Sequence, residues 1–99
     1  MECDEIEGIH PLFRKRISDL IPGAKIIKEA KPPNGLCDFL VKVDGEKRPV
    51  EIKAGFFKKD GVIQLRRYMN FYKASIGYAV AKSLKCELPS DMIFIELSR

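Results

Sequence analysis

Two acidic residues and one lysine are spaced so that a single β-hairpin would bring them together. Asp38 lies early in a β-like segment, and Glu51 and Lys53 lie late in the segment that follows. The dipeptide Asp44-Gly45 favours a tight turn, and antiparallel pairing around it places Asp38 beside Glu51. Because side chains alternate between the faces of a strand, Glu51 and Lys53 share one face. The sequence therefore predicts two carboxylates and an ammonium group at one point of a sheet.

This set of side chains suits one kind of chemistry. Carboxylate oxygens are the ligands that Mg²⁺ prefers, and this ion keeps several waters and takes other ligands from substrate phosphate. A bound metal lowers the pKa of a water molecule and neutralises charge that develops on phosphorus. A lysine two residues after the glutamate can orient that water or bind the phosphate. The three residues thus meet the needs of phosphodiester hydrolysis with Mg²⁺ or Mn²⁺ as cofactor.

Hydrophobic patterns outline the elements that must position these residues. Pro11 suits the first turn of a helix and Pro22-Gly23 ends it, while the extension of this helix upstream through residues 4–9 stays open. We expect helices at residues 12–21 and 62–74, and strands at residues 24–29, 36–43, 47–54, 76–81 and 92–97. Residues 56–61 read as a basic loop. Three successive strands and a helical crossover predict an α/β fold, with a mixed central sheet flanked by helices.

Length and composition bound the class of protein. With 99 residues the chain forms one domain, residues 1–99, and 45% hydrophobic with 32% charged residues is ordinary for a soluble globular protein. No apolar run reaches the roughly 20 residues of a membrane span, and the N-terminal residues are acidic, unlike a secretory signal. We therefore expect an intracellular, cytoplasmic protein without membrane contact, and its compact, lysine-rich character fits an archaeal or viral source.

Residue types and charge favour a nucleic acid over a structural zinc ion. Cys3, Cys37 and Cys86 are widely spaced, no CxxC pair exists, and His10 is the only histidine, so we expect free thiols. His10 reads as a residue of the helix N-terminus, not as a general base. The net charge of +4 and the pI near 9.0 favour a polyanionic partner.

The spacing of the three residues resembles a known family. Asp38, twelve intervening residues and then Glu51-x-Lys53 on a hairpin flanked by helices are similar to the PD-(D/E)XK nuclease superfamily. The resemblance implies a restriction-endonuclease-like αβββαβ core. It also implies that Asp38 and Glu51 ligate Mg²⁺ or Mn²⁺ together with the backbone carbonyl of Ile52. Cys37 stands where the family motif has proline.

The second predicted helix extends this resemblance. The run from Gln64 to Tyr68 fits the QxxxY pattern of RecB-like nucleases, and a glutamine at this offset also occurs in archaeal Holliday-junction resolvases and VRR-NUC nucleases. The resemblance implies that Gln64 lies near the metal and that Tyr68 contacts DNA or packs in the core. Such families also carry an acidic residue on the first helix, for which Glu7 is the first candidate and Glu5 the second.

Basic and aromatic residues supply candidate contacts with a substrate or a second subunit. We expect phosphate contacts from the basic residues that follow the predicted site, Lys58, Lys59, Arg66 and Arg67, with Arg14 and Arg16 as weaker candidates. The apolar residues Phe56, Phe57 and Phe71 form either a homodimer interface or part of the core. Other acidic residues have structural interpretations: Asp44 belongs to the turn, Glu46 to solvent, and Asp91 to a cap or turn before the last strand.

The function that these features favour is a Mg²⁺-dependent DNA endonuclease. It would be structure-selective, as a Holliday-junction resolvase is, and act in replication, repair or recombination. An exonuclease or nickase of the RecB type would use the same residues. A catalytically weak nuclease fold that binds nucleic acid, and a basic binding module unrelated to nucleases, are the alternatives from another class. For Glu51 and Lys53, a solvated strand face with a cross-strand ion pair is the structural alternative.

Overall fold

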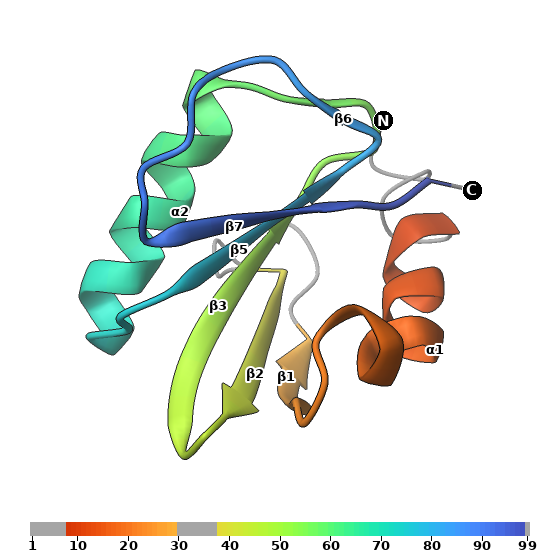
Figure 1. Cartoon of the computed structure of the whole chain (residues 1–99), viewed down its shortest axis with the longest axis vertical. Helices are drawn as coiled ribbons and strands as arrows, with labels where there is room; N and C mark the ends of the chain where they lie inside the picture. Colours follow the sequence, from red (N-terminus) through yellow and green to blue (C-terminus); the bar gives the residue numbers. More distant parts are fainter. Residues whose placement is uncertain (1–7, 30–37, 99) are drawn as a thin grey trace.

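The structure of the chain, a computed structural model, describes residues 8–29 and 38–98 (Figure 1). The helices in this part are α1 (His10–Leu20) and α2 (Lys59–Tyr72). The strands are β1 (Lys25–Glu29), β2 (Phe39–Val43), β3 (Glu46–Ile52), β4 (Phe56–Phe57), β5 (Gly77–Ala81), β6 (Ser83–Leu84) and β7 (Met92–Glu96). Neither of these two helices is long and apolar enough to cross a membrane.

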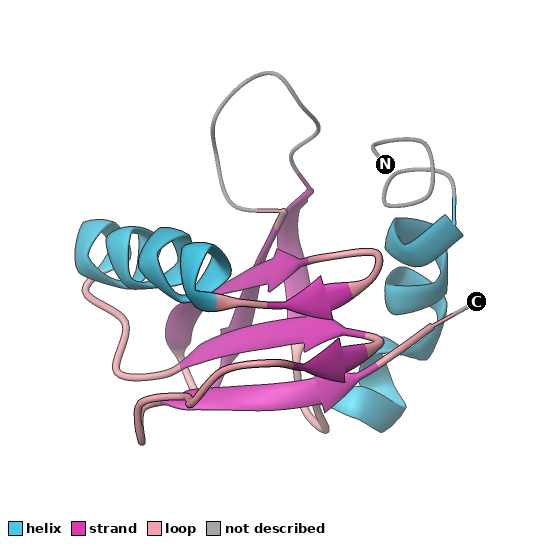
Figure 2. Cartoon of the chain, turned by 90° about the horizontal axis from the view of Figure 1, so that it is seen from above, coloured by secondary structure: helices cyan, strands magenta, loops and turns pink. Residues whose placement is uncertain are grey.

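Five strands form one mixed sheet in the order β1-β2-β3-β5-β7. Strands β1, β2 and β3 are antiparallel neighbours, whereas β5 runs parallel to both β3 and β7. Helix α2 lies between β3 and β5 in the chain and covers one face of the sheet, while α1 covers the other (Figure 1). The view from above in Figure 2 shows the same two helices on opposite sides of the strands. The predicted mixed sheet flanked by helices is therefore confirmed.

The hairpin between β2 and β3 turns at the predicted position. Val43 pairs with Glu46, and Asp44 and Gly45 between them have positive φ angles of 52° and 79°. Positive φ at both central residues defines a type I′ turn, whose twist matches that of the flanking strands. The turn sets a register in which Phe39 opposes Val50, so that residue 38 reaches the level of residue 51.

Alternation along the strands divides the core between the two faces. Towards α1 the strands contribute alternate apolar residues, which pack with Phe13 and Ile21: Phe39, Val41, Val43, Val50, Ile52, Tyr78 and Val80. Towards α2, Leu65 and Met69 pack with Ala79, Ala81 and Met92. Residues 50 and 52 of β3 thus face α1. The alternate positions 51 and 53 face α2, as the period of a strand predicts.

Residues 56–61, predicted as a basic loop, instead form β4 and the first turn of α2. Strand β4 pairs in parallel with β6, and the Phe57 ring is fully buried against α2, so that Phe57 belongs to the core while Phe56 and Phe71 are exposed. Gly61 belongs to this predicted loop but lies in the first turn of α2. A Cβ atom there would stand 2.9 Å from Phe57 Cε1, so the close approach of helix and ring requires glycine.

Glu46, expected in solvent, ties the hairpin to the segment after α2. Its carboxylate accepts hydrogen bonds from Arg48 Nε at 2.8 Å and from Ser75 N and Oγ at 3.1 and 2.8 Å. The hydrogen bonds from Arg48 and Ser75 lower the pKa of the Glu46 carboxyl. The carboxylate stays at the surface, but its contact with Ser75 spans 29 residues of the chain, and a local sequence pattern carries no signal for it.

We predict that Gly77→Ala destabilises the fold, because α2 packs directly on the start of β5. An added Cβ atom would stand 2.7 Å from Met69 Sδ and 3.0 Å from Leu65 Cδ1. Overpacking of this kind costs about 1–3 kcal/mol of unfolding free energy, which urea denaturation measures. In the control Gly55→Ala, the added Cβ meets no atom within 4 Å beyond its chain neighbours. The control should change stability by less than about 0.5 kcal/mol, and an equal effect of the two variants would contradict this packing.

Candidate active site

The hairpin brings the two predicted acidic residues to one end of the sheet. Asp38 directly precedes β2, and its Oδ2 accepts a hydrogen bond from the backbone N–H of Ile52 at 2.7 Å. This bond holds the Asp38 carboxylate beside the last residues of β3, where Glu51 lies. Glu51 is 6% exposed, so its carboxylate is largely removed from water. A carboxylate in such a place needs a partner, since an unpaired buried charge is costly.

Lys53 and Gln64 complete the group. The Lys53 ammonium nitrogen lies 3.4 Å from Glu51 Oε2 and donates to Gln64 Oε1 at 3.3 Å. Gln64 comes from the second turn of α2, which packs on the face of β3 that carries residues 51 and 53. Four predicted residues, from the hairpin and from the crossover helix, are thus brought together. The ion pair offsets the charge of Glu51, and Gln64 fixes the position of the ammonium group.

The donors at this point fit a hard divalent cation. Asp38, Glu51 and the Ile52 backbone offer only oxygen ligands, the type that Mg²⁺ and Mn²⁺ prefer. Each Asp38 oxygen accepts one hydrogen bond, and a carboxylate has about four lone-pair positions, so acceptor capacity remains. Among the residues that the structure describes, no cluster of three or more His, Cys, Asp or Glu side chains is placed to hold a metal. Mg²⁺ needs only one or two carboxylates, because it retains waters and binds substrate phosphate.

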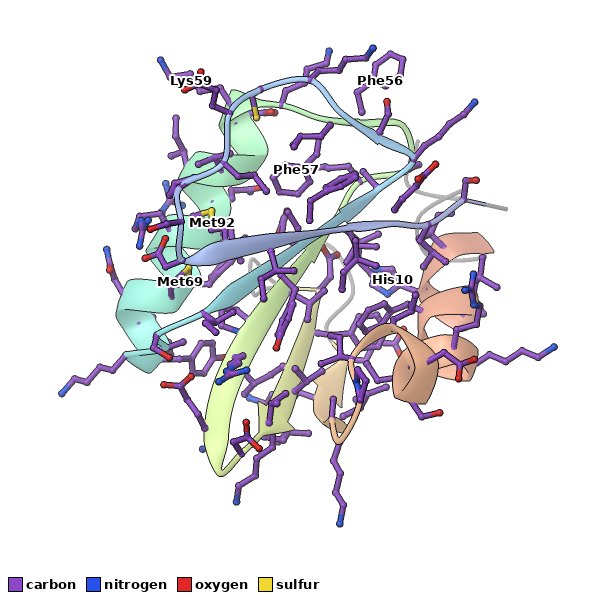
Figure 3. All side chains as sticks on the ribbon, in the orientation of Figure 1. His10, Phe56, Phe57, Lys59, Met69 and Met92 are labelled. Carbon is purple, nitrogen blue, oxygen red and sulfur yellow. The ribbon has the colours of Figure 1, made fainter. Side chains whose placement is uncertain are left out.

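His10 is a residue at this end of the sheet whose contacts sequence reasoning missed. It is the first residue of α1, as expected, but its ring is fully buried between the helix and the sheet (Figure 3). Its Nδ1 lies 3.0 Å from Glu29 Oε2 and its Nε2 lies 3.1 Å from Asp38 Oδ1. A signal was present in the sequence: the only histidine of the chain stands directly before Pro11, at the start of an amphipathic helix.

The surroundings of His10 favour a ring that carries both protons. A neutral imidazole donates from one nitrogen only, whereas here both nitrogens face carboxylate oxygens. Burial lowers the pKa of the ring, but the hydrogen bonds and charges of Asp38 and Glu29 outweigh it and raise the pKa of His10 above its usual 6.5. A protonated ring would balance two carboxylates at the end of the sheet.

A further ion pair continues from Glu29 to the surface. Glu29 Oε1 lies 2.8 Å from Arg14 Nε, and the Arg14 side chain is 45% exposed. Arg14, predicted as a weak candidate for phosphate binding, is therefore engaged by the carboxylate behind His10. The first-helix candidates Glu7 and Glu5 lie outside the described residues, as does Cys37.

The candidate DNA contacts differ in their surroundings. Lys58, Lys59 and Arg67 are exposed. Arg66 donates two hydrogen bonds to Asp91, from Nη1 at 2.7 Å and from Nη2 at 2.8 Å. Asp91 lies in the turn directly before β7, as predicted, and also holds α2. Tyr68 is 9% exposed and packs beside Leu40, which corresponds to the core alternative for this residue.

Solved structures of repair endonucleases share this fold, although no family model matches the sequence. A repair endonuclease from Pyrococcus abyssi superposes with a TM-score of 0.75 at 22% identity, over 93% of this chain and 46% of that one. EndoMS in complex with double-stranded DNA gives a TM-score of 0.67 at 23% identity, over 80% and 36% of the two chains. EndoMS in its apo form gives 0.68 at 20% identity, over 95% and 45%. The chain thus spans less than half of each of these proteins, and at this identity the likeness establishes the fold.

Proposed function

We propose that this chain is a metal-dependent nuclease domain of the PD-(D/E)XK type that hydrolyses phosphodiester bonds in DNA. The observation that carries the proposal is the meeting of Asp38, Glu51, Lys53 and Gln64 where the start of β2 lies beside the end of β3. An ion pair on a solvated strand face, the structural alternative, would leave these groups exposed. Glu51 is instead buried, and Lys53 reaches across to a second element, which supports a built site.

Each residue has a role that follows from its contacts. Asp38, Glu51 and the Ile52 carbonyl would hold Mg²⁺ or Mn²⁺, which lowers the pKa of an attacking water and neutralises charge on the phosphate. Lys53 donates to Gln64 and forms an ion pair with Glu51, and an ammonium group with three N–H donors would also bind the water or a phosphate oxygen. Gln64 acts through Lys53 by fixing its ammonium group. The fixed dipoles and charges need no rearrangement as negative charge grows in the transition state.

Double-stranded DNA is the substrate that the surroundings favour. Lys58 and Lys59 follow the predicted catalytic strand closely and are exposed, and Arg67 is exposed on α2. Such residues contact phosphates without reading bases. The structural likeness to a repair endonuclease and to EndoMS with bound double-stranded DNA supports the same substrate class.

Within this class we propose a structure-selective endonuclease that acts on repair or recombination intermediates such as Holliday junctions. A domain of this size has little surface for base readout beyond its site, so backbone shape is the feature left to recognise. A homodimer would present two sites to two strands of a branched substrate. Phe71, which is 73% exposed at the end of α2, offers apolar surface for such an interface.

Cleavage of labelled DNA tests the proposed site. Duplex, single-stranded, flap and four-way-junction substrates are incubated with Mg²⁺, Mn²⁺ or EDTA, using wild type, Asp38→Ala and Lys53→Ala. We expect metal-dependent cleavage that falls by about a hundredfold or more in each variant, because several kcal/mol of transition-state stabilisation are removed. Internal cuts in the junction or flap would distinguish an endonuclease from a RecB-like exonuclease or a nickase.

The matched control for this experiment is Asp44→Asn, which removes a carboxylate from the turn of the same hairpin. Asparagine tolerates the positive φ of 52° at this position, so the fold and the cleavage rate should both be kept. Folded wild-type protein that binds DNA but cleaves none of the substrates would overturn the enzyme and favour a nucleic-acid-binding module. An unchanged cleavage rate in both Asp38→Ala and Lys53→Ala would mean that other residues carry the activity.

A second prediction concerns the lysines at the start of α2. Lys58→Ala combined with Lys59→Ala should weaken DNA binding in EDTA and reduce the slope of log K against log salt concentration by about 2, close to one unit for each phosphate that is no longer neutralised. Fluorescence anisotropy at several salt concentrations measures both quantities. The control replaces two exposed lysines that pair across β2 and β3 beside the hairpin turn, Lys42 and Lys47. Equal salt slopes for the two double variants would contradict this placement of DNA.

A further inference from the structure

The Asp38 carboxylate is held from two directions. Its Oδ2 accepts the Ile52 amide hydrogen at 2.7 Å from the sheet, and its Oδ1 lies 3.1 Å from His10 Nε2 of α1. One bond to each oxygen fixes both the direction of the side chain and the plane of the carboxylate. The second bond spans 28 residues of sequence, so it joins Asp38 to an element outside the hairpin.

His10 is itself fixed on its other side. Its Nδ1 lies 3.0 Å from Glu29 Oε2, at the end of β1, and its ring packs against Phe39 with centroids 4.9 Å apart. No part of the side chain is exposed. Both nitrogens are therefore engaged inside the protein, and His10 is out of reach of a substrate. Its contact with the proposed site is the one between Nε2 and Asp38 Oδ1.

The outermost member of the chain of contacts is Arg14, which lies 2.8 Å from Glu29 Oε1. The contacts thus run from a half-exposed guanidinium through Glu29 and His10 to Asp38. They join α1, β1 and the start of β2, which are three separate elements of the chain.

Stability alone would favour an apolar residue at position 10. Its neighbours in the core are Ile9, Phe13 and Phe39, and a buried charged network is often no more stabilising than apolar side chains of similar volume. A hydrogen bond to a ligating carboxylate has a different benefit, because it orients the ligand before the metal arrives. Removal of such an outer partner typically lowers metal affinity or activity by about 10- to 100-fold.

We propose that His10, which is held in place by its contact with Glu29, is a positioning residue. It keeps the Asp38 carboxylate in the orientation needed to bind the catalytic metal. This inference rests on the proposed nuclease site, since it assigns His10 and Glu29 to the metal ligand Asp38. Arg14 steadies Glu29 from the surface and has a smaller effect.

The test measures Mn²⁺ binding to the full chain without DNA, by the electron paramagnetic resonance signal of free Mn²⁺. His10→Phe keeps an aromatic ring against Phe39 but removes both hydrogen bonds, and should raise the Kd for Mn²⁺ by about 10- to 100-fold. Cleavage assays on the same variant should show a lower kcat with little change in the KM for DNA. Tyr78→Phe is the matched control: it removes the buried hydrogen bond from Arg48 in the same core cluster and should leave the Mn²⁺ affinity unchanged.

Two variants at Glu29 keep the test decisive if His10→Phe fails to fold. Glu29→Ala frees the ring and should weaken Mn²⁺ binding by about tenfold. In Glu29→Gln the amide can donate to Nδ1 and accept from Arg14, which leaves the Nε2–H for Asp38. This conservative variant should recover the affinity to within about threefold of wild type.

The outcomes separate this inference from the function on which it rests. If Asp38→Ala abolishes Mn²⁺ binding while folded His10→Phe, or Glu29→Ala, binds as wild type does, positioning is overturned and the metal site stands. Equal Mn²⁺ affinities of Glu29→Ala and Glu29→Gln would also overturn the positioning role, because the hydrogen bond between residue 29 and His10 would then have no effect on metal binding. If wild type and Asp38→Ala bind Mn²⁺ equally, the metal site and the positioning role fall together.

Discussion

The hydrogen bond from Ile52 N–H to Asp38 Oδ2, at 2.7 Å, joins the start of β2 to the end of β3, and the site depends on the pairing that this bond completes. Side chains alternate along a strand, so a slip of one residue in register would turn Glu51 and Lys53 from α2 towards α1. The type I′ turn at Asp44-Gly45 sets this register from the other end of the hairpin. Local turn geometry thus decides which groups meet at the opposite end of the hairpin.

The polar residues of the site lie where two apolar cores end. Alternate residues of β2, β3 and β5 pack against α1 or against α2, and carboxylates gather at the end of the sheet between them. Each of these carboxylates has a cationic neighbour: Glu51 has Lys53, Asp38 has His10, and Glu29 has both His10 and Arg14. Compensation of this kind offsets the cost of placing several acidic groups close together in a partly buried position.

The sequence predicts features that depend on residues close together in the chain, and it does not predict contacts between residues far apart. The hairpin, the meeting of Asp38 with Glu51 and the helix that carries Gln64 rest on turn chemistry and periodicity, and both are visible in short stretches of sequence. The pairs His10–Glu29 and His10–Asp38 span 19 and 28 residues and exist only once α1 has packed on the sheet. The same holds for Glu46 with Ser75 and for Arg66 with Asp91. Gly61 was assigned to a loop for a related reason, since its tolerance in α2 depends on the Phe57 ring beneath it.

The most direct test of the metal site is anomalous X-ray diffraction from crystals of the protein soaked in Mn²⁺. The proposed site predicts one strong peak about 2.1 Å from carboxylate oxygens of Asp38 and Glu51 and from the carbonyl oxygen of Ile52. The hydrogen bond between His10 and Asp38 should persist beside that peak. A Mn²⁺ ion bound by other residues, with Asp38 and Glu51 keeping only their protein contacts, would contradict the proposal that these residues form a metal-dependent nuclease site.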